Sequence, residues 1–156
     1  MLKRLFRPRN VAIAIVIFFV AIQAVPVWAW QTNPPVVTDV AWTTPEAASI
    51  ARRACYDCHS NETVWPWYSK VAPVSWLVTY DVIKGRNELN FSLPLREPAE
   101  LAQEIAEVVL EGEMPPRQYL LAHPEAKLNP QEVQALIAGT PGYAGNLLTT
   151  GEHDDD

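Results

Sequence analysis

Two cysteines and a histidine lie together in the segment Cys55-Tyr56-Asp57-Cys58-His59. Thiols separated by two residues can add to the two vinyl groups on one edge of a haem, and a histidine that follows directly can bind the iron. This order of residue types is the attachment signature of a c-type haem. The segment therefore predicts covalent attachment through Cys55 and Cys58, with His59 as the proximal iron ligand.

Other uses of closely spaced cysteines fit the chain less well. Structural zinc needs four Cys or His ligands, whereas the chain has only these two cysteines, and His123 and His153 lack the usual zinc-ligand spacing. A thioredoxin-like redox pair would need a βαβ context, which the flanking sequence does not provide. A disulfide between Cys55 and Cys58 would leave His59 without a role. One covalently attached haem c is the expected cofactor.

The sixth iron ligand has two candidates. Met114 is the only methionine besides the initiator, and Pro115 after it favours an extended backbone that fixes where the sulfur points. A thioether there would complete the iron coordination, although a lone methionine can also simply fill a gap in a core. His123 is the alternative ligand, because neutral imidazole binds iron readily. We expect His59 and Met114 to be the two metal ligands.

Aromatic residues are dense after the motif, at Trp65, Trp67, Tyr68 and, in the next predicted helix, Trp76. Side chains of this kind need a large apolar surface to cover, and a haem would supply one. Ordinary core packing is the alternative. Arg86, near the end of that helix, is a candidate partner for a haem propionate, or else a surface arginine near a helix C-terminus.

Residues 1–30 form a predicted membrane anchor. Residues 11–30 contain Gln23 as their only polar side chain, and as a helix they would span about 30 Å, enough for a bilayer core. Trp28 and Trp30 suit the outer interface. The basic residues before this stretch should stay in the cytoplasm, which places the rest of the chain on the extracytoplasmic, periplasmic side. These residues are Lys3, Arg4, Arg7 and Arg9.

A cleaved signal peptide is the alternative to the anchor. Its apolar core would be residues 11–22, and its end would be Val27-Trp28-Ala29. The apolar run is long for a signal peptide, so we expect an uncleaved, single-pass anchor. In either case the haem domain is exported.

The rest of the chain predicts short helices and no strands. Residues 31–43 form an extended tether, residues 44–139 an all-α domain, and residues 140–156 an acidic tail expected to be disordered. Helices are expected from Pro45 to about residue 57, from residue 74 to about 89, from Pro98 to Gly112, and from Pro130 to Gly139, with caps at Thr44 and Asn129. In the third of these, an apolar stripe contains Leu101, Ile105, Val108 and Val109.

Charge limits the choice of partner. Four of the twelve basic residues lie in the first 30 positions, and all eighteen acidic residues come later. Nucleic acid is not an expected partner of the folded part, because phosphate binding needs clustered Lys and Arg. An acidic domain instead predicts redox partner proteins with a basic docking face.

With these residues in hand, the domain resembles the haem-binding domain family of small monohaem cytochromes. The resemblance covers about residues 33–138 and implies a cytochrome c-like helical fold, a covalent haem and an N-terminal membrane segment. It rests on residues 55–63, 65–68, 72–77, 85–86, 89–92, 112–115, 123–126, Tyr119 and Leu128, in that family's order.

These observations predict an electron carrier rather than an enzyme. The expected function is single-electron transfer on the extracytoplasmic side, to or from a respiratory or photosynthetic membrane complex. One alternative is a haem-bearing accessory subunit of a larger membrane complex. Another is a ligand-sensing or peroxidase-like haem protein with a labile sixth ligand.

Overall fold

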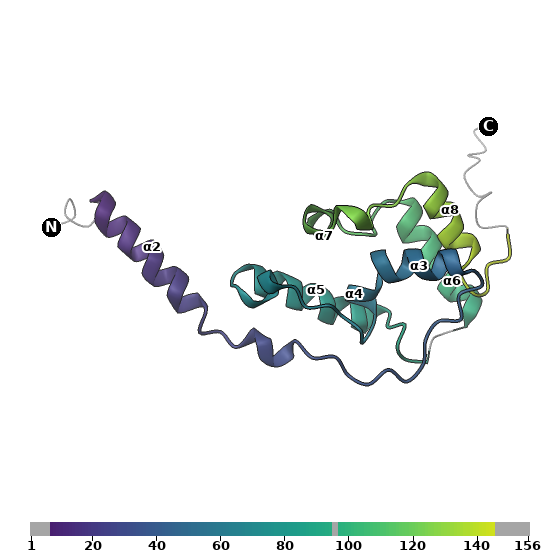
Figure 1. Cartoon of the computed structure of the whole chain (residues 1–156), viewed down its shortest axis with the longest axis horizontal. Coiled ribbons are helices and arrows are strands. Elements are labelled where there is room, and N and C mark those ends of the chain that lie inside the picture. Colours follow the sequence, from purple (N-terminus) through teal and green to yellow (C-terminus); the bar gives the residue numbers. More distant parts are fainter. Residues whose placement is uncertain (1–6, 95–96, 146–156) are drawn as a thin grey trace, which may run out of the picture. The chain divides into compact units, whose positions relative to one another are not determined.

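The structure, a computed structural model, describes residues 7–94 and 97–145. Within these ranges every regular element is a helix (Figure 1), which confirms the predicted all-α class. The described residues form two compact units. The first consists of the residues up to Thr32 together with Val64–Ile83, and the second of Asn33–Thr63 together with the residues from Lys84 on.

The first unit contains the apolar leader. Its elements are α2 (Pro8–Ile22), the 3₁₀ turns η1 (Val27–Trp30) and η2 (Trp67–Lys70), and residues 74–83 of α5 (Val74–Glu88). By length and composition Pro8–Trp30 can cross a membrane, but the single helix predicted over residues 11–30 is interrupted after Ile22. The cause is Pro26, which lacks an N–H donor and whose ring would clash with the carbonyl of Ile22 in a continuous helix.

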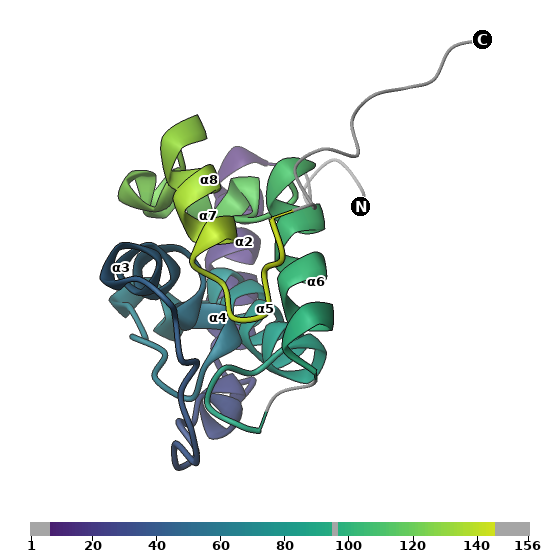
Figure 2. The same cartoon turned by 90° about the vertical axis from the view of Figure 1, so that its right-hand side faces the viewer.

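The second unit contains the haem motif and a small bundle. Two predicted caps are confirmed, since Thr44 Oγ1 accepts a hydrogen bond from Ala47 N–H and Asn129 forms a capping box with Glu132. Helix α8 packs against both α3 and α6, as both views show (Figures 1 and 2). Besides residues 84–88 of α5, the elements are α3 (Pro45–Ala54), α4 (Tyr56–His59), α6 (Pro98–Leu110), α7 (Arg117–Ala122), η3 (Pro124–Ala126) and α8 (Pro130–Ala138).

One apolar cluster holds the second unit together. The predicted stripe of α6 is confirmed, because Leu101, Ile105 and Val109 are buried and Val108 packs against them. The cluster is completed by the haem-motif residue Tyr56 and by residues from α3, α8 and the segments that flank them. Its buried members are Val40, Ile50, Ala51, Tyr56, Phe91, Leu101, Ile105, Val109 and Leu136.

Three boundaries differ from those read in the sequence. Residues 33–43, most of the predicted extended tether, belong to the second unit, where Val40 is buried and the N–H groups of Val37 and Thr38 donate to the carbonyl of Ser92. Thr140, just outside the predicted domain, is packed and only 1 % exposed. Residues 64–83 group with the leader. The rest of the predicted acidic tail, residues 146–156, lies outside the described residues.

Candidate haem site

Cys55 directly precedes α4, and Cys58 lies within it. The carbonyl of Cys55 accepts hydrogen bonds from the N–H groups of Cys58 (3.1 Å) and His59 (2.9 Å), so one turn gathers the whole motif. Neither thiol is in a disulfide, which leaves both for attachment chemistry. Burial raises the pKa of Cys55 to about 12, so its free thiol stays protonated at neutral pH.

His59 is oriented by the segment that follows α5. Its Nδ1 lies 3.0 Å from the carbonyl oxygen of Leu89, and its own carbonyl accepts a hydrogen bond from Phe91 N–H (2.7 Å). Burial lowers the pKa of His59, which favours the neutral imidazole that metals bind. When Nδ1–H donates to a carbonyl, Nε2 keeps the lone pair for the iron.

Gly85 lets α5 pass directly over the haem motif. A Cβ atom at this position would lie 2.7 Å from the carbonyl oxygen of Cys58, closer than two such atoms can approach. The glycine therefore brings Leu89, one turn further along, to His59.

Arg86 braces the loop that leaves the motif. Its Nε–H donates to the carbonyl of Ser60 (2.7 Å), and one terminal nitrogen donates to Asn33 Oδ1 (2.9 Å) and Thr63 Oγ1 (2.8 Å). Thr63 Oγ1 in turn donates to the carbonyl of Asp57 within the motif (2.7 Å). The arginine is thus a structural support for the site, and its contact with a haem propionate stays a prediction.

Met114 lies in the same cluster as the haem motif. The turn after α6 is closed by Gly112, whose φ of +71° suits glycine, and Met114 N–H donates to the carbonyl of Val108 (3.1 Å). The half-buried side chain packs on the apolar cluster, as Cys55 and Leu89 do. The structure therefore brings this methionine to the cluster that carries Cys55, and its bond to iron stays a prediction.

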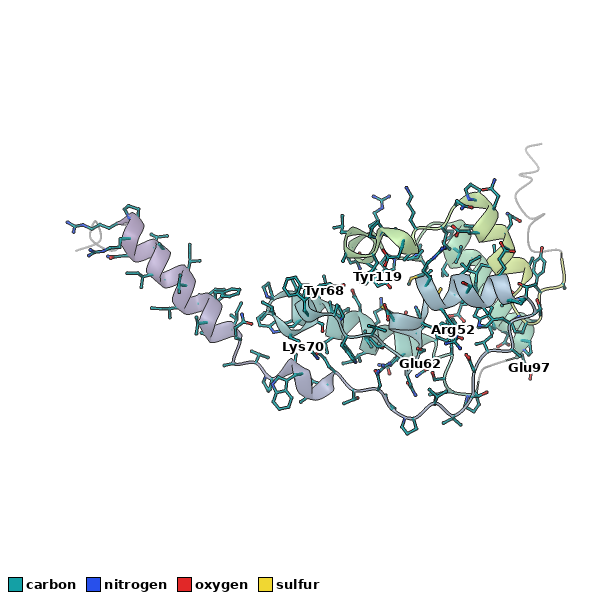
Figure 3. The ribbon with its side chains drawn as sticks, in the orientation of Figure 1. Arg52, Glu62, Tyr68, Lys70, Glu97 and Tyr119 are labelled. Carbon is teal, nitrogen blue, oxygen red and sulfur yellow. The ribbon has the colours of Figure 1, made fainter. Side chains whose placement is uncertain are left out.

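His123 is held on α7 by surface contacts. Its ring stacks on Tyr119 with centroids 4.3 Å apart, and its Nδ1 lies 3.2 Å from Glu125 Oε1. Tyr119 O–H donates to Asp57 Oδ2 (2.8 Å), which joins α7, labelled at Tyr119 in Figure 3, to the haem motif. These contacts favour a supporting role for His123 over iron ligation.

The predicted haem-covering aromatic residues belong to the first unit. Trp67 is 79 % exposed and Trp76 36 % exposed there, while Trp65 and Tyr68 are half-buried. Their contact with a haem stays a prediction.

A second network around Tyr56 was not expected from the sequence. Tyr56 O–H donates to Asp39 Oδ1 (2.5 Å) and accepts from Trp42 Nε1–H (3.1 Å). Arg52 pairs with Asp39 and with Glu62 (Figure 3). Asp39 and Trp42 lie in the segment interpreted as a tether, so the available signal was the aromatic Trp42 close to the apolar residues Val36, Val37 and Val40.

The haem-binding domain family matches residues 17–141 of the chain. The chain belongs to the haem-binding domain family. The match includes the Cys55–His59 motif, Met114 and residues 17–30 of the leader, so the resemblance noted from the sequence is confirmed. No curated protein and no solved structure matches the chain.

Proposed function

We propose that this haem-binding protein is a membrane-anchored, monohaem c-type cytochrome that transfers single electrons on the extracytoplasmic side. The observation that carries the proposal is the arrangement of His59. Its Nδ1 is engaged by the carbonyl of Leu89, and two cysteines that are not joined in a disulfide precede it within one turn. This combination fits covalent haem with one axial histidine.

Four residues would bind the haem directly. Cys55 and Cys58 would carry the two thioether bonds, His59 Nε2 would be one axial ligand and Met114 Sδ the other. When bound, the haem supplies a one-electron iron couple whose potential is raised by His/Met ligation. A hydrogen bond from Nδ1–H to the Leu89 carbonyl would leave Nε2 of His59 to the iron, and the apolar cluster packs against Cys55 and Met114.

An acidic face on α6 supports a basic redox partner. Glu100, Glu104, Glu107 and Glu111 recur at intervals of four, three and four residues, which places them along one side of the helix. Glu113 continues the negative charge to the residue beside Met114. A partner with a basic face would be steered toward this helix, with a rate that falls as salt screens the charges.

The leader supports anchoring in the cytoplasmic membrane with the haem domain outside. Residues 8–30 are apolar enough to span, and the basic residues lie before them, at Lys3, Arg4 and Arg7, or at their start, at Arg9. The intact mass of protein purified from membranes should include the leader.

Two measurements test the proposal. Acidified acetone should leave the haem on the purified full-length protein, because thioether bonds resist extraction, and loss of colour to the solvent would refute c-type attachment. The reduced protein should then be oxidised by the cation tris(1,10-phenanthroline)cobalt(III) at a rate that falls with rising salt, and by the anion ferricyanide at a rate that rises. The same salt response for both oxidants would argue against an acidic electron-transfer face.

A further inference from the structure

The leader is bound to the folded part of the first unit by Gln23. The Oε1 atom of Gln23 accepts a hydrogen bond from Ala72 N–H (2.9 Å), and its Nε2 donates to the carbonyls of Ala72 (3.2 Å) and Phe19 (2.9 Å). The side chain of Gln23, at the end of α2, therefore both donates to and accepts from the backbone of Ala72, between η2 and α5.

Gln31 makes a second connection at the end of η1. Its Nε2 donates to the carbonyl of Ser69 (2.5 Å) and to Thr79 Oγ1 (2.9 Å). Its Oε1 accepts from Lys70 Nζ (2.5 Å). With two connections, the segment from η2 to α5 must follow the leader to whatever depth in the membrane the leader takes.

The length of α2 sets that depth. Its 15 residues span about 22 Å, at 1.5 Å per residue. A bilayer core is about 30 Å thick, so about 8 Å of hydrocarbon remains beyond Ile22 when Pro8 lies at the cytoplasmic boundary. Either Gln23 lies within the outer boundary or the bilayer thins to meet it. Ala72, which satisfies the glutamine amide, takes the same depth: inside the outer boundary in the first case and at it in the second.

The residues carried to this depth expose apolar and aromatic side chains. On α5, Trp76, Tyr80 and Ile83 recur at i, i+4 and i+7 and are 36 %, 61 % and 40 % exposed. Trp67 on η2 is 79 % exposed. We call Trp67, Trp76, Tyr80 and Ile83 the aromatic face of the first unit.

The leader also exposes aromatic side chains. Trp28 and Trp30 on η1 are 68 % and 57 % exposed. A cavity of about 260 Å³ lies where the leader meets the loop, and Trp28, Val27 and Lys70 are among its lining residues. Tyr68 and Lys70 mark this loop in Figure 3. Tryptophan, tyrosine and a lysine amine are the groups that favour the headgroup region of a bilayer.

We propose that the aromatic face rests in the headgroup region of the extracytoplasmic leaflet, so that its occupant is lipid. The inference rests on the membrane anchor of the proposed function and deepens it, because the protein would meet the bilayer through residues 64–83 as well as through one helix. Lipid is favoured over a protein partner because the face is joined by hydrogen bonds to the end of the spanning segment.

Photocrosslinking in lipid nanodiscs tests the proposal. Benzoylphenylalanine placed at Trp67, Phe18 or Leu121 of the full-length haem-loaded protein is irradiated in discs of phosphatidylcholine and phosphatidylglycerol. Leu121 in the second unit is 88 % exposed and is the matched control for Trp67. We expect lipid adducts at positions 18 and 67, with a yield at 67 several-fold above that at 121.

The three positions separate the possible failures. Absence of lipid adducts at position 18 would refute the anchor itself. Adducts at 18 with no excess at 67 over 121 would overturn the aromatic face while leaving the anchor in place. Adducts between position 67 and a second protein chain, in native membranes, would assign the face to a protein partner and also overturn the proposal.

The two glutamines supply an independent test. The double variant Gln23→Ala, Gln31→Ala should lower the lipid adduct yield at position 67 several-fold while leaving that at position 18 unchanged. The visible haem spectrum is the control for the fold of the second unit. An unchanged yield at position 67 would show that the connections do not set the depth of the aromatic face, and would overturn that part of the inference.

Discussion

The Nδ1 atom of His59 lies 3.0 Å from the carbonyl oxygen of Leu89, a residue 30 positions later in the chain. The same segment returns a second hydrogen bond, from Phe91 N–H to the carbonyl of His59. The direction of the proximal imidazole therefore depends on where α5 ends and how closely it passes the motif. Substitutions in the last turns of α5 test that dependence.

Gly85→Ala should disturb the site without touching a ligand. Its Cβ would lie 2.7 Å from the Cys58 carbonyl oxygen, so α5 must move away and take the Leu89 carbonyl with it. We expect a loss of about 1–3 kcal/mol in the free energy of unfolding and less haem per protein, measured by denaturant unfolding and by the haem-to-protein absorbance ratio. Asn87→Ala, an exposed position on the same helix, is the control. Equal behaviour of the two variants would contradict the close-packing argument.

Arg86→Ala removes the hydrogen bonds to Ser60, Asn33 and Thr63. A hydrogen bond from a charged donor typically stabilises a protein by about 1.5–3 kcal/mol. We expect the free energy of unfolding of the haem-loaded protein to fall by about that amount, measured by denaturant unfolding. Asn33→Ala removes one of these acceptors and the hydrogen bond from Asn33 Nδ2 to the carbonyl of Thr63, both belonging to a neutral side chain, and should cost less. A variant as stable as wild type but with a shifted haem potential would instead support the propionate role.

The pair formed by Arg53 and Glu132 predicts a pH dependence of stability. Hydrogen bonding from Arg53 (2.6 Å) lowers the pKa of Glu132 below its ordinary 4.5. A carboxylate of this kind stabilises the fold above its unfolded pKa, and the contribution is lost as the pH falls through 4.5 toward the lower folded value. Glu132→Gln keeps an acceptor for the capping box but removes the charge.

The stability difference between wild type and Glu132→Gln should therefore be present at neutral pH and shrink as the solution is acidified. It should be small, because both side chains are partly exposed. Unfolding curves at a series of pH values measure it. Arg53→Gln should give the same loss, and the double variant no more than either. A difference that is constant with pH would show that the charge of Glu132 is not involved.

Local rules predicted the parts of the fold that depend on neighbouring residues. The caps at Thr44 and Asn129, the stripe of α6 and the glycine stop after it follow from short-range patterns, and the structure confirms them. The helix expected over residues 11–30 was too long, because composition indicates apolarity but the break follows from Pro26. The stretch stays apolar up to Trp30, although its helix ends at Ile22.

Contacts between distant residues could not be predicted in the same way. Leu89 meets His59 through a backbone carbonyl, which has no sequence signature of its own. Gln23 looked like an isolated polar residue in an apolar run, and its partner Ala72 is 49 residues away. Such pairs depend on the arrangement of helices, which no local pattern specifies.

Met114→Ala tests the iron coordination on which the high-potential role depends. If the Met114 sulfur is the sixth ligand, the variant should lose the weak red-region band of the ferric protein, which reports a sulfur-to-iron bond. Its potential should fall, because thioether ligation raises the haem potential. The open position should bind carbon monoxide in the ferrous state. Optical spectra, redox titration and carbon monoxide difference spectra of the full-length protein measure these changes.

His123→Ala is the matched control, because His123 is the other candidate ligand. Its ring stacks on Tyr119 and lies near Glu125, contacts that do not involve the iron, so the red band and the potential should survive its loss. Loss of low-spin character in His123→Ala, with Met114→Ala unchanged, would instead establish bis-histidine ligation. Because bis-histidine haems have lower potentials than His/Met haems, that result would also remove the protein from the high-potential class of electron carriers.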